Sequence, residues 1–492
     1  MKDHTMHRYT LALATLPLLY ALAGCGGGAD GDKTVVPTSC AGDCIEPYDP
    51  GVLAKHTLAA QPASTPLLAH DATVPTVTLA PLTPQPATAG TADPGQPLQI
   101  GQGRASAQTA TPDATAALLH WQASARETHV AALRFASQDA FGVRLGVSVE
   151  ALPADALLRV YGEDGVAYEI TSRQLQDLAQ RNAAGGASEQ IARIWWSPQT
   201  QGAQATLEIE IPATADAADV RIAVPRLTHI TASRQPPALI LKKTSGACEI
   251  NVVCTPEFID QGRSVARLYF VDSADGNAYL CTGTLLNDAQ SSGKPYLLTA
   301  RHCIADQATA STLVTDWLWR ASACGNADTD AAHQERTGGA TLLHADKDTD
   351  VAFMLLNAAV PAGVVYAGSY FGPDAGIGTQ VSVVHHPQGD LQKVSQGTVR
   401  GYNTCTLGAG DSILCSASDE ASGTFLSVNW QQGITEPGSS GTGAFVAIGA
   451  RRYLAGQLFA GTPTSCEAPN GTDYFGRFNL SYRNALRTWL DP

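Results

Sequence analysis

The stretch on which the interpretation of this chain depends is Thr435-Glu-Pro-Gly-Ser-Ser-Gly-Thr-Gly-Ala-Phe445. Its glycines allow positive φ angles and a close approach of the backbone to a bound group. A serine in such a turn can present its hydroxyl while neighbouring N–H groups converge on one point, as an acyl-transfer nucleophile with an oxyanion hole requires. The alternative is a Gly/Ser-rich surface loop, and the rest of the chain decides between the two.

A serine nucleophile at Ser439 or Ser440 needs a general base, and histidine suits neutral pH. The last histidine of the chain is His386, so every candidate base precedes the serine. This excludes the order Ser…Asp…His and leaves His…Asp…Ser or Asp…His…Ser. His302 is the best candidate, because Tyr296-Leu-Leu-Thr-Ala-Arg-His-Cys303 predicts a buried strand that delivers the histidine at a turn.

The carboxylate that orients the histidine should be buried and held in one position. Asp346, Asp348 and Asp350 lie close together, but only Asp350 directly precedes the apolar run Val-Ala-Phe-Met-Leu-Leu356. We therefore expect Asp350 to enter the core, and we interpret the other two aspartates as parts of a solvated acidic turn.

The length and charge of the chain limit its organisation and its partners. With 492 residues the chain predicts two or three domains with linkers. Its formal net charge is −14, from 31 Lys and Arg against 45 Asp and Glu. Without a block of basic residues, a nucleic-acid partner is not expected.

The N-terminus predicts export. Lys2 and Arg8 precede an apolar run, 11–21, that is too short to span a bilayer. The run ends in Leu22-Ala-Gly-Cys25, which indicates a signal peptide over 1–25 and resembles a bacterial lipobox, with lipidation at Cys25. Gly26 gives no signal for retention in the inner membrane, so we expect an outer-membrane lipoprotein, a secreted protein after processing, or both. The alternative is an ordinary signal peptide with an incidental cysteine.

Composition divides the remainder of the chain into segments. Residues 26–111 are rich in Ala, Pro and Thr, and we predict a disordered tether there. Residues 112–235 predict a small β-sandwich-like pro-domain with one helix at 172–183, and 236–243 is a linker. Residues 244–492 have many strands, glycine-rich turns and a helix only at 482–490, which favours antiparallel barrels or sandwiches. The fold class is therefore all-β.

Eleven cysteines are present, and removal of the lipidated Cys25 leaves an even number. In an exported protein this indicates disulfides. Zinc is the rival interpretation, but only Cys40 and Cys44 have short spacing, and no histidine lies near them. We expect no metal and no cofactor.

The motifs together resemble chymotrypsin-like serine proteases and, within them, bacterial lysyl endopeptidases. The shared sequences run from Cys248 to the C-terminus and cover about half of the chain: Cys248-Glu-Ile-Asn-Val-Val-Cys254, CTGTLLN, LTARHC, VHHP, VNWQ, TEPGSSG, GQL, Asp473-Tyr-Phe-Gly-Arg477 and the final WLDP. The resemblance implies two six-stranded β-barrels with a catalytic triad in the cleft between them.

The family's functional residues carry over to matching positions. The resemblance implies that His302 is the general base, Asp350 its orienting carboxylate and Ser440 the nucleophile. The oxyanion hole would be the N–H groups of Gly438 and Ser440. Ser439 stands where related enzymes carry an acidic residue, and we interpret it as a turn residue.

The same resemblance implies the disulfides Cys248–Cys466, Cys254–Cys324 and Cys281–Cys303. These pairs leave Cys405 with Cys415 as a fourth bridge, and Cys40 with Cys44 as a candidate fifth in the tether.

Specificity depends on a pocket carboxylate. Asp473 matches the aspartate that lysyl endopeptidases place at the base of the first specificity pocket, and a buried carboxylate favours a cationic side chain. The alternative is an aspartate that only caps a turn before Gly476. Phe459 replaces a histidine that follows GQL in the family, and the family's tryptophan near the catalytic histidine has no counterpart between Cys405 and Cys415. Lysine against arginine therefore stays open.

The functional prediction is a monomeric serine endopeptidase that hydrolyses proteins and peptides after basic residues and contacts the membrane only through its lipid. The alternative is a catalytically inactive, protease-like binding module on the cell surface. A preference for acidic residues is disfavoured, because Asp473 would repel glutamate. Lys242 and Lys243 predict a self-processing site that frees the protease, and a solvated dibasic linker is the alternative.

Overall fold

The computed structural model describes residues 40, 42–53, 64–68, 73–82, 97–232, 245–373, 376–407, 413–462 and 465–492. The predicted signal peptide with Cys25 and the predicted processing site at Lys242 and Lys243 lie outside these residues. No helix of the described residues is long and apolar enough to cross a membrane.

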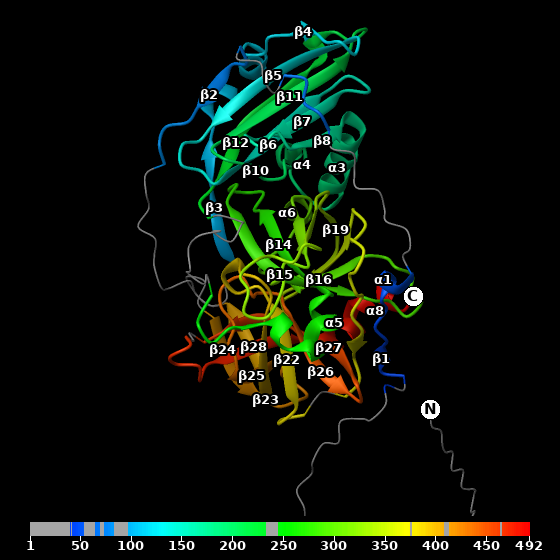
Figure 1. The fold of residues 1–492 in the computed structure, drawn as a ribbon. Coiled ribbons are helices and arrows are strands. Elements are labelled where there is room, and N and C mark those ends of the chain that lie inside the picture. Colours follow the sequence, from blue (N-terminus) through cyan, green and yellow to red (C-terminus); the bar gives the residue numbers. More distant parts are fainter. Residues whose placement is uncertain are drawn as a thin grey trace, which may run out of the picture. The chain divides into compact units, whose positions relative to one another are not determined.

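The region before the linker is a sandwich of two sheets (Figure 1). One sheet has the order β2-β5-β11-β7-β8, with bounds Thr76–Thr78, Thr128–Ala136, Gln204–Pro212, Leu157–Tyr161 and Ala167–Thr171. In the other sheet the order β10-β6-β12-β3 has bounds Thr200–Gln201, Gly142–Ala151, Arg221–Ile230 and Leu98–Ala105. Leucines of both sheets are fully buried in one core: Leu133, Leu145, Leu158, Leu207 and Leu227. Alternating strand patterns thus predicted this sandwich correctly.

The predicted helix at 172–183 is confirmed as α3 (Ser172–Ala184). Its start is encoded locally, because the Thr171 side chain accepts from the backbone N–H of Gln174 and the Gln174 side chain accepts from that of Thr171. Such a capping box satisfies two N–H groups that would otherwise lack partners.

The described parts of 26–111 differ from the predicted tether. β1 (Cys44–Ile45) pairs with β21 (Ser369–Tyr370), β2 pairs in parallel with β5, and β3 lies between β12 and β15. These strands are short and polar, so their own composition predicts no structure. They are ordered because β1 and β2 each extend the edge of a sheet built by other segments, whereas β3 is paired on both sides, with β12 and with β15. The boundary predicted at residue 112 is therefore too late.

The C-terminal half contains a closed ring of six strands. β27 (Arg451–Gly461), β26 (Gly443–Ile448), β22 (Gln380–His385), β23 (Lys393–Leu407), β25 (Phe425–Gln432) and β28 (Thr472–Arg477) pair in that order, and β28 pairs again with β27. Inside it, Val383, Val399, Val428 and Phe475 are fully buried. One of the two six-stranded barrels implied by the resemblance is thus present.

The other sheet of the C-terminal half has seven strands, where the resemblance implies a barrel of six. Its order is β18 (Gln334–Arg336), β17 (Val314–Trp317), β14 (Val265–Val271), β15 (Ala278–Leu286), β16 (Tyr296–Ala300), β20 (Val351–Leu356) and β19 (Ala340–Asp346). Leu268, Leu297, Trp317 and Met354 form its core. The final helical segment is α7 (Phe478–Ser481), a π-helical turn (Tyr482–Leu486) and α8 (Arg487–Leu490), and it packs in a cluster with Phe353 and Phe445, one from each sheet.

All five expected disulfides are present in the described residues: Cys40–Cys44, Cys248–Cys466, Cys254–Cys324, Cys281–Cys303 and Cys405–Cys415. Cys248–Cys466 joins residues 218 positions apart and ties the start of the protease region to its last third. Cross-links that close long loops restrict the unfolded chain most.

Strand β3 joins the N-terminal sandwich to the C-terminal half of the chain. It pairs with β12 on one side and with β15 on the other. The turn between β14 and β15 adds polar contacts, since Gly103 N donates to Asn277 Oδ1 (2.9 Å) and Arg226 donates to Ala274 O (2.7 Å). A Cβ at Gly103 would lie 2.2 Å from Asp275 O.

Substitution Gly103→Ala should therefore destabilise this joint. We expect a loss on the order of 1–3 kcal/mol in the free energy of unfolding of the full chain, because backbone must shift to admit the methyl group. Gly401→Ala is the matched control, since its nearest contact would be Ser427 Oγ at 3.6 Å. Urea unfolding of both variants measures the difference, and equal stabilities would contradict the prediction.

Candidate active site

The loop between β25 and β26, residues 433–442, is called the catalytic loop below, and it contains Ser439 and Ser440. Gly438 and Gly441 have φ angles of 95° and 82°, in the region that glycine adopts readily. A Cβ at Gly441 would lie 2.1 Å from Thr299 Oγ1 of β16. The glycines thus serve both purposes expected from the sequence: they allow positive φ and a close approach of the backbone.

His302 and Asp350 meet because their strands are neighbours. β16 pairs with β20, with Ala300 opposite Val351, so the residues that follow one strand and precede the other share one end of the sheet. His302 N donates to Asp350 Oδ1 (2.9 Å), and His302 Nδ1 lies 2.7 Å from Asp350 Oδ2. With its proton on Nδ1, the imidazole leaves Nε2 as an acceptor. Nε2 is buried and has no hydrogen-bond partner among the described residues.

Asp350 is held in an uncommon backbone conformation, with φ 54°. The preceding residue is anchored to the six-stranded ring, since Gln457 Nε2 donates to Thr349 O (2.6 Å) and Thr349 Oγ1 lies 2.8 Å from Ser481 Oγ. Positive φ costs a non-glycine residue energy and persists where the surroundings enforce it. Asp350 is buried as expected, whereas Asp348 is exposed.

Two sets of contacts connect the catalytic loop to the region of His302. In the first set, Thr282 N of β15 donates to Ser440 O (2.8 Å), and the neighbouring Cys281 is bonded to Cys303, next to His302. In the second, the ring of Phe459 contacts the ring of His302 edge-on, with centroids 5.9 Å apart. Phe459 follows Leu458, whose carbonyl accepts from Gly441 N (2.8 Å).

Two N–H groups flank the nucleophile candidate without partners. Ser439 N donates to Glu436 O (3.0 Å) and Gly441 N donates to Leu458 O. For Gly438 N and Ser440 N, the described part of the chain contains no acceptor. Preorganised donors of this kind can stabilise an oxyanion that develops beside the serine.

Asp473 lies in β28, 1% exposed, and accepts at Oδ2 from two side chains. Trp430 Nε1 donates over 2.8 Å, and Thr435 Oγ1 of the catalytic loop donates to the same oxygen. Burial raises the pKa of the Asp473 carboxyl to about 7, against the lowering effect of these two donors. A Cβ at Gly461 would lie 2.1 Å from Oδ1, so the glycine keeps that side of the carboxyl free of a side chain.

Sequence reasoning missed several residues that build the site. Thr282, Trp430 and Gln457 lie within the motifs CTGTLLN, VNWQ and GQL, but the motifs alone assigned them no role. Each acts on a partner far away in the chain, which local spacing does not reveal. One cluster of metal-ligand residue types, Cys40, Cys44 and Glu46, occurs among the described residues, and its two cysteines are tied in a disulfide.

Comparisons with known proteins match the two regions separately. The model of the lysyl endopeptidase C-terminal domain matches residues 242–476, and that of the lysyl endopeptidase N-terminal domain matches residues 73–231. The start at 73 agrees with the inclusion of β2 and β3 in the pro-region.

A lysyl endopeptidase from Pseudomonas aeruginosa is 32% identical over 416 residues, which cover 80% of this chain and 82% of that protein. Among solved structures, the active and inactive forms of the Rv3671c protease from M. tuberculosis are 13% and 14% identical. They cover 49% of this chain and 86% and 96% of their own, with TM-scores of 0.32 and 0.31, too low to support a conclusion. From the two matched domains and the extended identity to the Pseudomonas protein, this chain belongs to the lysyl endopeptidase family and is a serine endopeptidase.

Proposed function

We propose that this protein hydrolyses peptide bonds after basic residues, with Ser440 as nucleophile, His302 as general base and Asp350 as the group that orients the histidine. The observation that carries the proposal is the contact of Asp350 with His302 at two points, which leaves Nε2 buried and without a hydrogen-bond partner among the described residues. A base prepared in this way is what an acyl-transfer serine requires.

The mechanism follows from these positions. Ser440 Oγ attacks the scissile carbonyl carbon while His302 Nε2 takes the hydroxyl proton, and Asp350 stabilises the resulting imidazolium. The carbonyl oxygen becomes an oxyanion and accepts from Gly438 N and Ser440 N. Collapse transfers the proton from His302 to the leaving amine and forms the acyl-enzyme. A water, deprotonated by the same histidine, then releases the acid and restores Ser440.

Specificity for a basic residue rests on Asp473. Its carboxyl is buried and accepts a hydrogen bond from Thr435 of the catalytic loop, the same loop that carries Ser440. A cationic side chain compensates a buried carboxylate, whereas an apolar or acidic one leaves it unpaired. The Pseudomonas relative is named for lysyl cleavage, and we extend that preference to this chain. Phe459 packs against His302 and Phe425 and forms the wall beside the catalytic histidine.

Purified protein should cleave lysyl amide and ester substrates, and Ser440→Ala should lower kcat at least on the order of 1000-fold, because the nucleophile is lost. Parallel assays with arginyl and glutamyl substrates measure the preference. Activity that survives Ser440→Ala would overturn the triad. Absence of activity in a correctly folded wild type would favour the inactive binding module, and activity on glutamyl substrates alone would overturn the pocket.

Affinity for cationic ligands should depend on pH through Asp473. Only the ionised carboxylate attracts an ammonium group, so we expect affinity for a lysine-like amine inhibitor to rise as pH rises through about 7 and then to level off. Asp473→Asn should weaken this inhibitor on the order of 100-fold and abolish its pH dependence. A neutral norleucine analogue is the control ligand, because His302 affects both ligands equally. A flat profile for the amine in the wild type would contradict the assignment.

We further propose export with a lipid on Cys25 and removal of residues 26–243 by cleavage at Lys242-Lys243. Residues 26–243 would then be a propeptide, and the mature protease would act outside the cell as a monomer. Because β3 pairs with β15 across the predicted cleavage site, the severed pro-region should stay bound until this contact opens.

Mass analysis of protein exported by its host tests the processing. We expect a secreted chain that starts directly after Lys242 or Lys243 in the wild type, and a full-length lipidated species in Ser440→Ala. The double variant Lys242→Gln with Lys243→Gln is the matched control, since it removes both basic residues and keeps the enzyme intact. A full-length tethered species in the wild type, unchanged by Ser440→Ala, would reject the proposal.

A further inference from the structure

Ser439, next to the proposed nucleophile, is fully buried and has two polar partners. Its Oγ lies 2.7 Å from His385 Nδ1, at the end of β22, and accepts from Glu436 N (3.3 Å). The interpretation of Ser439 as a simple turn residue is therefore incomplete, because a turn residue needs no partner from another strand.

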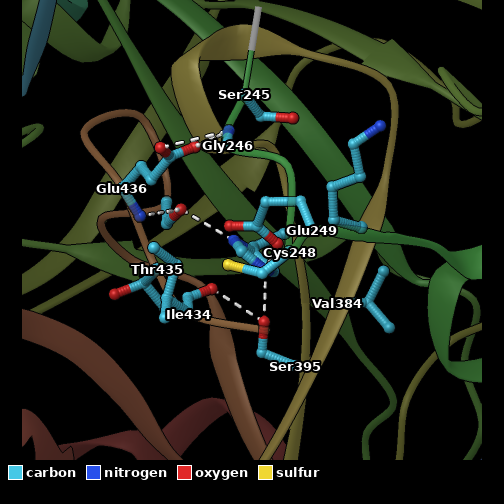
Figure 2. A network of polar contacts seen from close by, with 12 residues as sticks. Ser245, Gly246, Cys248, Glu249, Val384, Ser395, Ile434, Thr435 and Glu436 are labelled. Carbon is cyan, nitrogen blue, oxygen red and sulfur yellow. Dashed lines mark hydrogen bonds and ion pairs between the residues drawn. The ribbon is translucent and has the colours of Figure 1, made fainter. Parts of the chain in front are cut away.

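His385 continues the contact to the beginning of the catalytic loop. Its Nε2 lies 3.1 Å from Ser395 Oγ of β23, and Ser395 Oγ donates to Ile434 O (2.7 Å). Figure 2 shows this last bond between Ser395 and Ile434, and a second link in which Gly246 N donates to Glu436 (3.1 Å). Ser395 and His385 thus connect the loop at two points, Ile434 and Ser439.

The proton positions in the chain Ser439–His385–Ser395–Ile434 follow from the number of donors and acceptors at each group. A carbonyl oxygen only accepts, so the single hydroxyl proton of Ser395 is used on Ile434 O. Ser395 must then accept from His385 Nε2–H, and the neutral imidazole accepts at Nδ1. Ser439 Oγ–H therefore donates to His385 Nδ1. Every contact is satisfied by one tautomer of an uncharged histidine.

The surroundings agree with an uncharged histidine. His385 is fully buried, and burial lowers its pKa to about 3, with further lowering by His386 and Lys393. Glu249 Oε2 lies 3.7 Å from His385 Nε2, but neither carboxyl oxygen has a hydrogen-bond partner in the described residues. Burial and the neighbouring Glu436 raise the pKa of Glu249 well above its ordinary value, which disfavours a negative charge beside His385.

We propose that His385 and Ser395 are positioning residues, which hold the catalytic loop through Ser439 and Ile434 so that Gly438 N and Ser440 N converge on the oxyanion. The loop needs such a hold, because its three glycines at positive φ, Gly433, Gly438 and Gly441, can adopt other conformations with little cost. The hold is an uncharged clamp of three side chains, Ser439, His385 and Ser395. The proposal rests on Ser440 as the nucleophile.

A pair of substitutions at His385 tests the clamp in the full-length protein. In His385→Asn the amide oxygen takes the place of Nδ1 and can accept from Ser439. In His385→Gln the amide nitrogen takes the place of Nε2 and reaches only Ser395. We expect His385→Gln and Ser439→Ala to lose on the order of 10- to 100-fold in kcat on a lysyl amide with KM nearly unchanged, and His385→Asn to recover most of it.

Inhibitor binding separates positioning from stability. A peptidyl lysine aldehyde forms an oxyanion with Ser440, whereas a simple lysine-like amine does not, so only the aldehyde should bind more weakly to Ser439→Ala and His385→Gln. Ser382→Ala is the matched control, because Ser382 is a buried serine of the same strand bonded to Gln261 and not to the loop. Thermal unfolding of each variant reports the folded fraction.

Two results would overturn the clamp. One is unchanged kcat and aldehyde affinity in folded Ser439→Ala and His385→Gln. The other is a loss of both inhibitors in proportion to the folded fraction, as a purely structural role predicts. If Ser440→Ala remained active, the proposed function itself would be wrong. This outcome is distinguishable from a failure of the clamp, because a failure of the clamp leaves Ser440→Ala inactive.

Discussion

The site depends on one interaction, the two-point contact of the Asp350 carboxylate with the backbone N–H and the Nδ1 of His302. One oxygen places the residue and the other places the ring, so the imidazole has one orientation and one tautomer. The contact requires strands β16 and β20 to be neighbours with Ala300 opposite Val351. It also requires Asp350 at positive φ, which Gln457 of the other sheet enforces through Thr349.

The catalytic loop is the counterpart of this contact, and it is supported from three directions. Thr282 holds the carbonyls of Gly438 and Ser440 from β15. The backbone of Leu458 holds the far end of the loop, and the next residue, Phe459, contacts His302. Ser395 contacts Ile434 at the beginning of the loop, and His385 contacts Ser439, which precedes Ser440. The glycines permit the backbone conformation of the loop, and the buried hydrogen bonds select it from the others that the glycines could adopt.

The buried carboxyl of Asp473, the proposed specificity group, contacts the same loop. Asp473 accepts from Thr435, so the carboxyl that we propose as the specificity group is hydrogen-bonded to the loop that carries Ser440. The elevated pKa of Asp473 also affects stability, since between pH 3.8 and about 7 the folded protein holds a proton that the unfolded chain has lost. The contribution of this group to stability therefore decreases as pH rises through that interval. A bound cation opposes this decrease.

The amino-acid sequence by itself determined the features that depend on neighbouring residues or on the order of residues along the chain. Glycine spacing predicted the catalytic loop, and alternation predicted the strands of the sandwich. The absence of histidine after His386 placed every candidate base before the serine. The local contexts of His302 and Asp350 selected these two residues, and the resemblance of the motifs then implied their roles and three of the disulfides. Only the tertiary structure decided which side chains meet across long separations. His385 and Ser439 are 54 residues apart, and Gly103 and Asn277 are 174 apart. Such contacts follow from strand neighbours and packing, and no local spacing in the chain specifies them.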